Sequence, residues 1–242
     1  MSAFAVIGHK GRMGQALEAA LGEAGHTLGA GLDLGDTPGP RLTGCDGVID
    51  FSAPDALEAN LGAARVAGLP ILVGTTGLEA SHHAMIDEAA KAIPVLQTGN
   101  TSLGVTLMAH LVREAASRLG SDWDIEVLEM HHRHKVDAPS GTAMLLGEAA
   151  AKARGVDLGQ AMDSGRHGHT GARNEGDIGF ATLRGGTVAG EHSVIFAGAE
   201  ERLTIAHSAE NRMIFARGAV RGAHWLLGRS PGRYRMEDVL GL

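Results

Sequence analysis

The sequence predicts an α/β protein with a Rossmann-like, doubly wound parallel sheet and a second α+β domain with an open mixed sheet. Three observations support this. Short apolar runs alternate with helical patterns through residues 3–97, as a doubly wound sheet requires. A glycine-rich loop follows the first run, as in nucleotide-binding folds. Beyond Ser102 several strand-like runs follow one another without intervening helices, which indicates a different domain.

Composition is that of a globular enzyme. The chain has 242 residues, of which 44% are hydrophobic and 20% charged, enough to bury the core of one large or two modest domains. A net charge of −7 argues against a nucleic-acid partner. A single cysteine, Cys45, excludes an internal disulfide, and no segment resembles a signal peptide or membrane span. We therefore expect a cytoplasmic protein with no membrane partner.

The elements of the first domain follow in a regular order. The alternation of apolar runs and helical periodicity predicts strand and helix in turn, and Pro54 suits the first turn of a helix. The expected strands are 3–8, 26–32, 47–51, 69–73 and 93–97, and the expected helices are 15–24, 54–67 and 79–92.

The loop after the first strand is a candidate dinucleotide site. Its glycines have the spacing G-x-x-G-x-x-G, and Lys10 stands where the usual fingerprint has its second glycine. Asp33 ends the second strand about 20 residues beyond the loop, where a carboxylate can hold the adenosine ribose. The alternative for Asp33 is an ordinary surface acid. The loop residues expected to contact the cofactor are Gly8, His9, Lys10, Gly11, Arg12 and Met13.

A second candidate cofactor contact follows the strand 69–73. Gly74, Thr75 and Thr76 lie at its carboxyl end, the edge at which parallel sheets bind ligands. They are candidates for the nicotinamide side of a dinucleotide. The alternative is a glycine turn that only connects two elements.

The highest density of reactive side chains lies just after residues 124–130, whose period-two alternation predicts a half-buried strand. Pro139 suits the first turn of a following helix over 139–154, Ser140 and Thr142 can satisfy backbone N–H groups, and Gly141 leaves those groups approachable. A helix N-terminus attracts negative charge, so a carboxylate or phosphate should bind here. The basic side chains that precede it are His131, His132, Arg133, His134 and Lys135.

Two other interpretations of this cluster remain open. Histidines suit zinc, copper or nickel, but in a strand His132 and His134 share one face while His131 takes the other. Arg133 and Lys135 would also repel a cation, so no metal is expected. The cluster could otherwise be a solvated basic loop.

The rest of the chain predicts the second domain and a final helix. A glycine- and histidine-rich passage, 164–171, has the composition of a loop, and we expect it to stay mobile until ligand binds. The expected helices are 103–119 and 213–227, and the expected strands are 178–183, 191–197 and 201–207.

The pattern E-x-H-H-x-x-K-x-D-x-P-S-G-T-A over residues 129–143 resembles the signature of the dihydrodipicolinate reductase family. The G-R-M-G segment at 11–14 is similar to the same family, and the resemblance extends from the first glycine loop to Val239. It implies a discontinuous dinucleotide-binding domain, 1–102 with 211–242, and a substrate-binding and oligomerisation domain, 103–210. It also implies a homotetramer, which would cover the open sheet.

The resemblance implies an enzyme of lysine and diaminopimelate biosynthesis. Its reaction is the NAD(P)H-dependent reduction of a cyclic imine dicarboxylate, 4-hydroxy-tetrahydrodipicolinate, to tetrahydrodipicolinate with loss of water. His131 and Lys135 match the family's catalytic pair. Matching substrate contacts are His132, Ser140, Gly141 and Thr142, and a further matching cofactor segment comprises Thr98, Gly99, Asn100 and Thr101, although an aromatic often stands at the last position.

The cofactor site departs from better-known members of the family, which often follow the ribose-binding acid with an arginine. Here Leu34 follows Asp33. Asp33 should repel the 2′-phosphate of NADPH, and Leu34 offers no counter-charge. Lys10 and Arg12 lie nearest the pyrophosphate, which both cofactors share. We therefore expect NADH to be preferred over NADPH.

Two alternative functions are compatible with the same domain plan. One is another amino-acid-pathway NAD(P)-dependent dehydrogenase, which turnover of the pathway imine would distinguish. The other is a non-catalytic NAD(P)-sensing protein, in which His131 and Lys135 would be dispensable.

Overall fold

The computed structural model describes residues 1–242 and divides into two compact units. The first unit contains Met1–Leu103 with Arg212–Leu242, and the second contains Gly104–Asn211. Each boundary between the two units lies within one residue of the predicted domain boundary. The functions assigned to the two domains remain predictions. No helix is long and apolar enough to cross a membrane.

The first unit is built on a six-stranded sheet in the order β11-β5-β4-β3-β1-β2, with every pair parallel. This is the predicted Rossmann-like, doubly wound arrangement. The order reverses between β1 and β3, and open α/β sheets bind ligands outside the carboxyl ends of their strands at such a point. The strands are β1 Ala3–Ile7, β2 Thr27–Leu32, β3 Gly47–Asp50, β4 Ile71–Val73, β5 Pro94–Gln97 and β11 Gly232–Tyr234.

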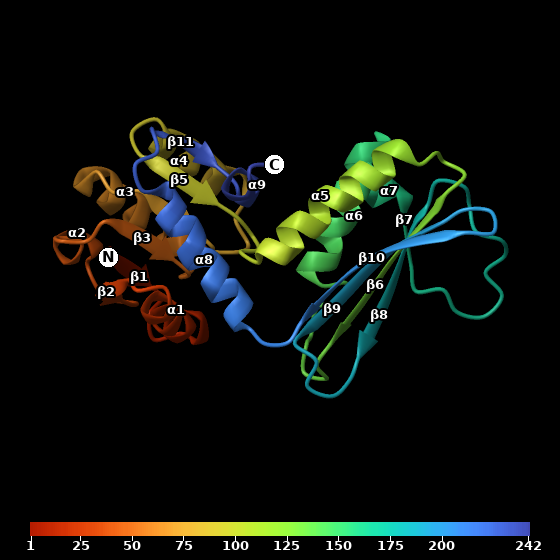
Figure 1. Ribbon diagram of the computed structural model, residues 1–242, viewed down its shortest axis with the longest axis horizontal. Coiled ribbons are helices and arrows are strands. Elements are labelled where there is room, and N and C mark those ends of the chain that lie inside the picture. The colour runs from red at the N-terminus through yellow and green to blue at the C-terminus, as the bar shows by residue number, and fades with distance from the viewer. The chain divides into compact units, whose positions relative to one another are not determined.

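Helices cover both faces of this sheet (Figure 1). Two separate hydrophobic cores result, one on each face. Helices α1 (Arg12–Glu23), α8 (Met213–Leu226) and α9 (Met236–Leu240) contribute to one core. The other contains side chains of α3 (Leu57–Ala67) and α4 (Ala80–Ala90), together with Leu42, which caps the short helix α2 (Pro38–Arg41). The short helix η1 (Pro54–Ala56) leads into α3.

Helix α8 returns from the end of the chain to pack against α1. An ion pair joins Arg217 to Glu23, with Nε and Oε2 2.8 Å apart. Gly218 lets the helix approach the segment after β5, because a Cβ there would overlap the carbonyl of Thr101. The Thr101 hydroxyl donates to the carbonyl of Phe215 at 2.7 Å. The C-terminal segment is thus part of the first unit's core.

The second unit contains a mixed five-stranded sheet in the order β10-β9-β6-β8-β7. Strand β6 is antiparallel to β9 and parallel to β8, which agrees with the predicted mixed sheet. The strands are β6 Asp124–His131, β7 Met162–Ser164, β8 Ile178–Arg184, β9 Gly190–Ala197 and β10 Arg202–Ala209.

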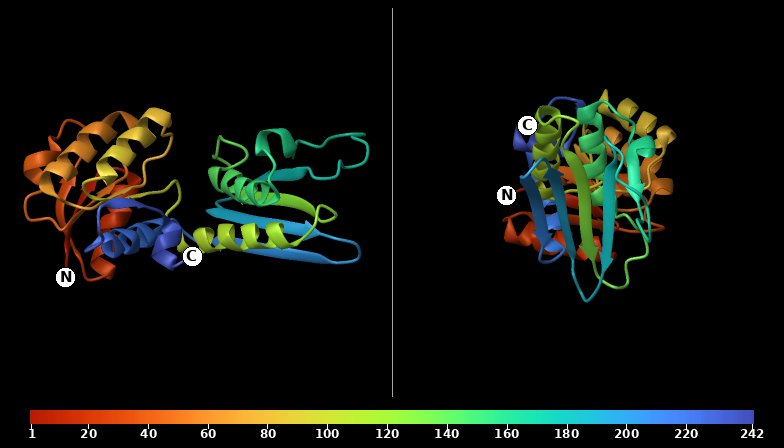
Figure 2. Two further views of the ribbon diagram at one scale, coloured as in Figure 1. Left: turned by 90° about the horizontal axis from the view of Figure 1, so that it is seen from above. Right: turned by 90° about the vertical axis from the view of Figure 1, so that its right-hand side faces the viewer.

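Helices α5 (Leu103–Arg118) and α6 (Gly141–Arg154) pack on one face of this mixed sheet, and the short α7 (Leu158–Ala161) follows α6. No helix covers the strands on the face turned toward the viewer in the right-hand view of Figure 2. Burial along β6 alternates strictly, with Ile125, Val127, Glu129 and His131 on the covered face. The sheet is therefore open on one side, as predicted.

Three expectations about element boundaries need correction. Strand β6 includes His131, so only His132 to Lys135 lie beyond the strand. The expectation that strand alternation places His132 and His134 on one face therefore does not apply to these residues. Helix α6 begins at Gly141, since Ser140 is its N-cap and its hydroxyl accepts from the amide of Ala143. Pro139 consequently lies before the helix. The elements α2, α7, α9, β7 and β11 were not expected, because three to five residues show no measurable periodicity.

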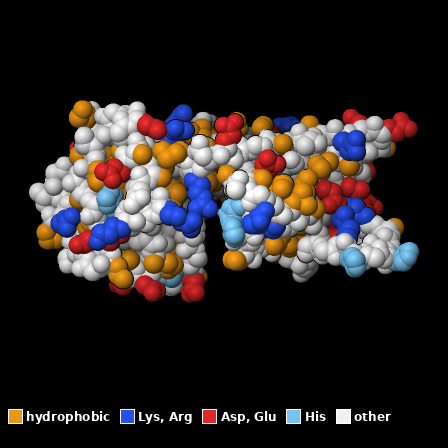
Figure 3. All heavy atoms as spheres, turned by 90° about the horizontal axis from the view of Figure 1, so that it is seen from below, with side chains coloured by type: hydrophobic (Ala, Val, Ile, Leu, Met, Phe, Trp, Pro, Cys, Tyr) orange, Lys and Arg blue, Asp and Glu red, His pale blue; other side chains and the backbone are white.

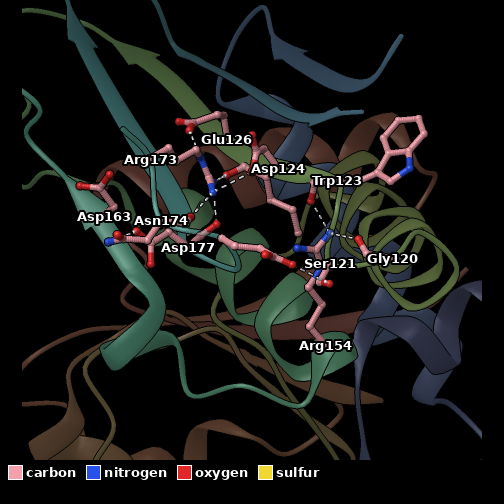
Figure 4. A network of polar contacts seen from close by, with 12 residues as sticks. Gly120, Ser121, Trp123, Asp124, Glu126, Arg154, Asp163, Arg173, Asn174 and Asp177 are labelled. Carbon is pink, nitrogen blue, oxygen red and sulfur yellow. Dashed lines mark hydrogen bonds and ion pairs between the residues drawn. The ribbon is translucent and has the colours of Figure 1, made fainter. Parts of the chain in front are cut away.

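The glycine- and histidine-rich passage leaves the sheet after Ser164 and returns at β8. Arg166 of this passage (164–171) and Arg173, which follows it, bind this stretch of the chain to β6 on the open face. Arg173 donates to Asp124, to Glu126 and to backbone carbonyls (Figure 4), and Arg166 donates to Glu126 and Asp163. Mobility of this passage before ligand binding stays a prediction.

Candidate active site

The glycine loop of the first unit leaves its backbone accessible at the start of α1. Gly8 has φ +82°, and a Cβ there would overlap the carbonyl of Phe51. A Cβ on Gly14 would overlap the backbone of His9, so both positions require glycine. Gly11 is the N-cap of α1 and provides no side-chain cap. The first-turn N–H groups are thus left for an external acceptor such as a pyrophosphate.

Asp33 lies beside this loop, as the sequence predicts. Its two carboxylate oxygens accept from the backbone N–H of Lys10 at 3.1 and 3.0 Å. The side chains of Lys10 and Arg12 are exposed, and so is Leu34 at the next position. A second carboxylate, that of Asp36, accepts from the amide of Asp33 at 2.8 Å. The predicted ribose end of the site therefore carries two acids.

His9 and Met13 occupy the same loop with different surroundings. The His9 ring packs against Gly31, where a Cβ would lie 2.7 Å from Nδ1. Its Nε2 pairs with Glu18 Oε2 at 3.0 Å. Met13 packs against the core shared with α8. The side chains of both residues therefore support the loop.

A buried carboxylate, Asp50, joins the loops that follow β3 and β4. It is fully buried, and accepts from the amide of Ser52 at 2.9 Å and its hydroxyl at 2.6 Å. It also accepts from Asn60 at 3.1 Å and, more weakly, from Thr75 at 3.5 Å. Burial raises the pKa of Asp50, while these hydrogen bonds act in the opposite sense. The sequence analysis missed this residue.

The remaining cofactor candidates lie at the same carboxyl edge. A Cβ on Gly74 would overlap the ring of Phe51, and Thr76 is exposed beside the buried Thr75. Thr98, Gly99, Asn100 and Thr101 form a tight turn after β5, in which the Thr98 hydroxyl donates to the Asn100 carbonyl at 2.8 Å. Thr101 is 2% exposed, so its side chain is turned into the protein and not toward solvent.

In the second unit, Glu129 and His131 occupy the covered face of β6. Glu129 is 1% exposed and His131 9%. His131 Nδ1 lies 2.6 Å from Glu129 Oε2. Arg184, at the end of the neighbouring β8, binds both carboxylate oxygens of Glu129 at 2.7 and 2.9 Å. The histidine is therefore held by a carboxylate that a guanidinium neutralises.

The N-terminus of α6 meets the same cluster. The backbone N–H of Ser140 donates to Glu129 Oε1 at 3.0 Å, and the Ser140 hydroxyl lies 3.0 Å from His192 Nε2. His192, on β9, packs edge-on against His131 with ring centroids 5.1 Å apart. Gly141 and Thr142 form the first turn of α6. The structure thus brings the predicted helix N-terminus beside the predicted catalytic histidine.

The loop 132–137 carries the other basic candidates. Lys135 Nζ pairs with Asp137 Oδ1 at 2.8 Å, and Arg184 donates to the carbonyl of Asp137 at 2.6 Å. The rings of His132 and His134 lie 6.4 Å apart, centroid to centroid. Lys135 is 20% exposed. A ligand carboxylate could exchange with Asp137 for its ammonium group.

The pKa shifts in this cluster have clear physical causes. Burial opposes ionisation of Glu129, but hydrogen bonds from Arg184, His131 and Ser140 together hold its pKa below the usual value. Burial, followed by the neighbouring His131, lowers the pKa of His192 to about 4. The cluster thus combines an ionised carboxylate with a neutral imidazole. No group of three or more His, Cys, Asp or Glu side chains is arranged to hold a metal ion.

Comparison with known proteins identifies the family. A family model described as dihydrodipicolinate reductase, N-terminus, matches residues 3–101, and one described as its C-terminus matches residues 104–240. The chain belongs to the dihydrodipicolinate reductase family. The resemblance seen in the sequence is thereby confirmed, and so is the predicted class of NAD(P)H-dependent oxidoreductase in lysine and diaminopimelate biosynthesis.

Relatives in this family match over nearly their whole length. The 4-hydroxy-tetrahydrodipicolinate reductase of Afipia carboxidovorans is 51% identical, and that of Zymomonas mobilis is 50% identical. Each match covers 98% of this chain and 96% of the relative. A dipicolinate-bound dihydrodipicolinate reductase from Paenisporosarcina sp. TG-14 has the same fold, with a TM-score of 0.77, 20% identity and 98% coverage of both chains.

Three residues of the second unit's cluster were missed by the sequence reasoning. Glu129 begins the family signature and precedes His131 by two positions, so strand periodicity alone places both on one face. That signal was available. Arg184 and His192 belong to other strands, 55 residues from Glu129 and 52 from Ser140 respectively. No local pattern predicts those contacts.

The pKa of His192 gives a testable stability effect. The unfolded chain protonates this residue near pH 6.5, whereas the folded protein does so only near pH 4. Stability is therefore complete above pH 6.5 and falls as the pH drops toward 4, by up to about 3 kcal/mol. We expect His192→Gln to lose less stability than the parent between pH 7 and 4, measured by urea unfolding. The exposed His134→Gln is the control, and equal pH dependence in all three proteins would contradict the assignment.

Proposed function

We propose that the second unit binds the cyclic imine dicarboxylate of the family's reaction and that His131 supplies a proton during its reduction. The observation that supports this most directly is the placement of His131, hydrogen-bonded through Nδ1 to Glu129 beside the N-terminus of α6. A candidate proton carrier and a candidate anion site therefore lie in one cluster. Reduction of a charged, conjugated substrate requires both.

The substrate carboxylates are expected at the helix N-terminus and the basic loop. Backbone N–H groups of Gly141 and Thr142, aided by the helix dipole, favour negative charge. The Ser140 side chain already caps α6, so its main contribution is to keep that first turn open and correctly oriented. His132 and Lys135 are the side chains that we assign to carboxylate binding.

In the proposed chemistry, loss of water from the substrate gives a conjugated ring, whose C4 carbon would receive a hydride from bound NAD(P)H. The added electron pair leaves excess density on the conjugated system, which must take up one proton. His131 donates that proton from Nε2, since Nδ1 is bound to Glu129. Lys135 polarises the ring while holding a carboxylate. Proton return from solvent restores His131 for the next turnover.

The first unit carries residues that fit the dinucleotide. The glycine loop from Gly8 to Met13 would hold the pyrophosphate, and Asp33 would accept from the adenosine ribose hydroxyls. The segments 74–76 and 98–101 lie at the carboxyl edge of the sheet, where we expect the nicotinamide end. Thr101 would contribute through its backbone, because its hydroxyl is bonded to Phe215.

The first prediction of this assignment concerns turnover. His131→Gln and Lys135→Met should each lower kcat by about 100-fold or more, the usual scale for lost proton transfer. NAD(P)H affinity, measured by fluorescence titration, should barely change. His134→Gln, an exposed histidine of the same loop, should retain parental kcat. Near-normal turnover in both His131→Gln and Lys135→Met would refute the assignment.

NADH preference is proposed from the charges around the ribose. The carboxylates of Asp33 and Asp36 both lie at the end of β2 and would repel a 2′-phosphate. The guanidinium of Arg41 lies 3.6 Å from the Asp36 carboxylate and donates to the Gly31 carbonyl. Its positive charge is therefore already partly neutralised. Leu34 is fully exposed and carries no charge. These features favour the cofactor that lacks the extra phosphate.

We expect kcat/KM for NADH to exceed that for NADPH by about tenfold, equal to about 1.4 kcal/mol. Leu34→Arg adds a cation next to Asp33 and should shift the ratio toward NADPH. Val66→Arg is the control, since Val66 is also an exposed aliphatic residue of the first unit, and it should leave the ratio unchanged. A parent enzyme that already prefers NADPH would show that Lys10 or Arg12 reaches the 2′-phosphate.

Homotetramer formation is proposed from the open face of the second unit's sheet. Hydrophobic side chains gather on this face, bordered by charged side chains (Figure 3). The half-buried or exposed hydrophobic residues on this face include Leu128 and Met130 on β6, Ala181 and Leu183 on β8, and Ile195 on β9. Burial of such a patch between copies is a common basis for assembly.

Light scattering should give a mass of about 100 kDa, four times the 25.0 kDa chain. Leu183→Glu places a charge on the open face and should lower that mass. Leu111→Glu changes a leucine of α5 that is similarly exposed, 44% against 48%, and should keep the parental mass. A parent that remains at 25 kDa would exclude the tetramer.

A further inference from the structure

We propose that Glu129, clamped by Arg184, is a positioning residue that fixes both the orientation and the tautomer of His131. Glu129 does not touch the substrate in this proposal. It acts by holding Nδ1 of His131, which leaves Nε2 as the nitrogen that exchanges protons. The inference rests on the proposed role of His131 as proton carrier.

The first argument is that Glu129 is a buried charge with a complete set of donors. A carboxylate that is 1% exposed is costly unless paired and hydrogen-bonded. Its Oε2 receives Arg184 Nη1 at 2.7 Å and lies 2.6 Å from His131 Nδ1. Its Oε1 receives Arg184 Nη2 at 2.9 Å and the Ser140 amide at 3.0 Å. One oxygen therefore serves the proton carrier and the other serves the anion-binding helix.

The second argument comes from the chemistry of the two groups. An ionised carboxylate only accepts hydrogen bonds, so His131 must keep its hydrogen on Nδ1 in both protonation states. The neutral ring then has its lone pair on Nε2, and the protonated ring carries its transferable hydrogen there. A neutral imidazole without this partner can place its hydrogen on either nitrogen. Glu129 removes the unproductive tautomer.

The third argument is steric. The His131 ring lies against His192 on one side, edge to face at 5.1 Å. Gly190 lies beside Nε2, where a Cβ would come within 3.0 Å of that nitrogen. Arg184 in turn is fixed by the carbonyls of Leu183 and Asp137. The ring, the carboxylate and the guanidinium therefore have little freedom to rearrange.

The titratable and charged groups near His131 lie on the strands around it and in the following loop. Those charges make the sign of the effect predictable, because removing a negative charge disfavours a protonated imidazole and removing a positive charge favours it. The titratable groups are Glu129 on β6, Arg184 on β8, His192 on β9, His207 on β10, and Lys135 and Asp137 in the loop.

The decisive experiment compares the pH dependence of kcat in Glu129→Gln and Arg184→Gln. Activity requires the protonated ring, so it falls as the pH rises through a midpoint. We expect this midpoint to move to lower pH in Glu129→Gln and to higher pH in Arg184→Gln, by about one unit each, or a tenfold change in proton affinity. In Glu129→Gln kcat should also fall about tenfold or more while KM changes less. Glu129→Asp keeps the charge and should keep the parental midpoint.

The matched control is Glu126→Gln. Glu126 lies on the same strand and pairs with two arginines, Arg166 and Arg173. The alternation along β6 places Glu126 on the opposite face, and Figure 4 shows its contact with Arg173. It makes no contact with His131. Its midpoint and kcat should be those of the parent, which separates a general loosening of β6 from a specific effect on His131.

A readout without turnover comes from ring-nitrogen NMR of ¹⁵N-histidine-labelled protein. The parent should show His131, assigned by its loss in His131→Gln, as the Nδ1-H tautomer at high pH, and Glu129→Gln should show a mixture or the Nε2-H form. Unchanged tautomer and unchanged midpoint in Glu129→Gln would overturn the proposal. If Glu129→Gln does not fold, the midpoint of Arg184→Gln decides, and a midpoint equal to that of the parent overturns the proposal.

Failure of the proposed function would look different. If His131→Gln keeps both activity and the parental pH profile, His131 is not the proton carrier and the function itself is refuted. If His131→Gln abolishes turnover while the Glu129 and Arg184 variants keep the parental midpoint and tautomer, only the positioning role is refuted.

Discussion

The second unit depends on one buried ionic contact, between the carboxylate of Glu129 and the guanidinium of Arg184. Around that pair meet the end of β6, the end of β8, the first turn of α6 and the loop that carries Lys135. Removing one member of such a pair leaves an uncompensated buried charge, which typically costs about 3–5 kcal/mol. The same contact that secures the fold therefore sets the geometry of the proposed proton carrier, so stability and reactivity are linked in one place.

Much of the architecture could be predicted because periodicity is local. The alternation along 124–130 and the helical pattern over 139–154 predicted β6 and α6 to within one or two residues at their ends. The distance from the glycine loop predicted that Asp33 lies beside that loop. The partners of Glu129 could not be found in this way. Arg184 and His192 reach it only through the pairing of β6 with β8 and β9, and strand register is not encoded in any short segment. The buried Asp50 was missed although two of its partners, Ser52 and Asn60, lie only two and ten residues away in sequence.

The two units solve the problem of a buried acid differently. In the first, Asp50 is surrounded by neutral donors from Ser52, Asn60 and Thr75, and burial dominates its pKa. In the second, Glu129 has a full cation beside it and stays ionised. A neutral shell suits an acid that joins two loops, whereas a charged shell suits an acid that must act on a neighbouring imidazole.

The discontinuous first unit has a consequence for how the chain is made. Its core joins Phe4 and Leu17 to Ala219 and Val220 of α8, and β11 completes the sheet at the edge of β5. A ribosome releases these C-terminal segments last, so the N-terminal sheet emerges with one face incompletely covered. The intervening 104–211 segment forms a compact unit with its own hydrophobic core, so it can fold before the C-terminal segments are made. The exposed interval is a period of vulnerability to aggregation, and its length is set by the rate of translation through the second unit.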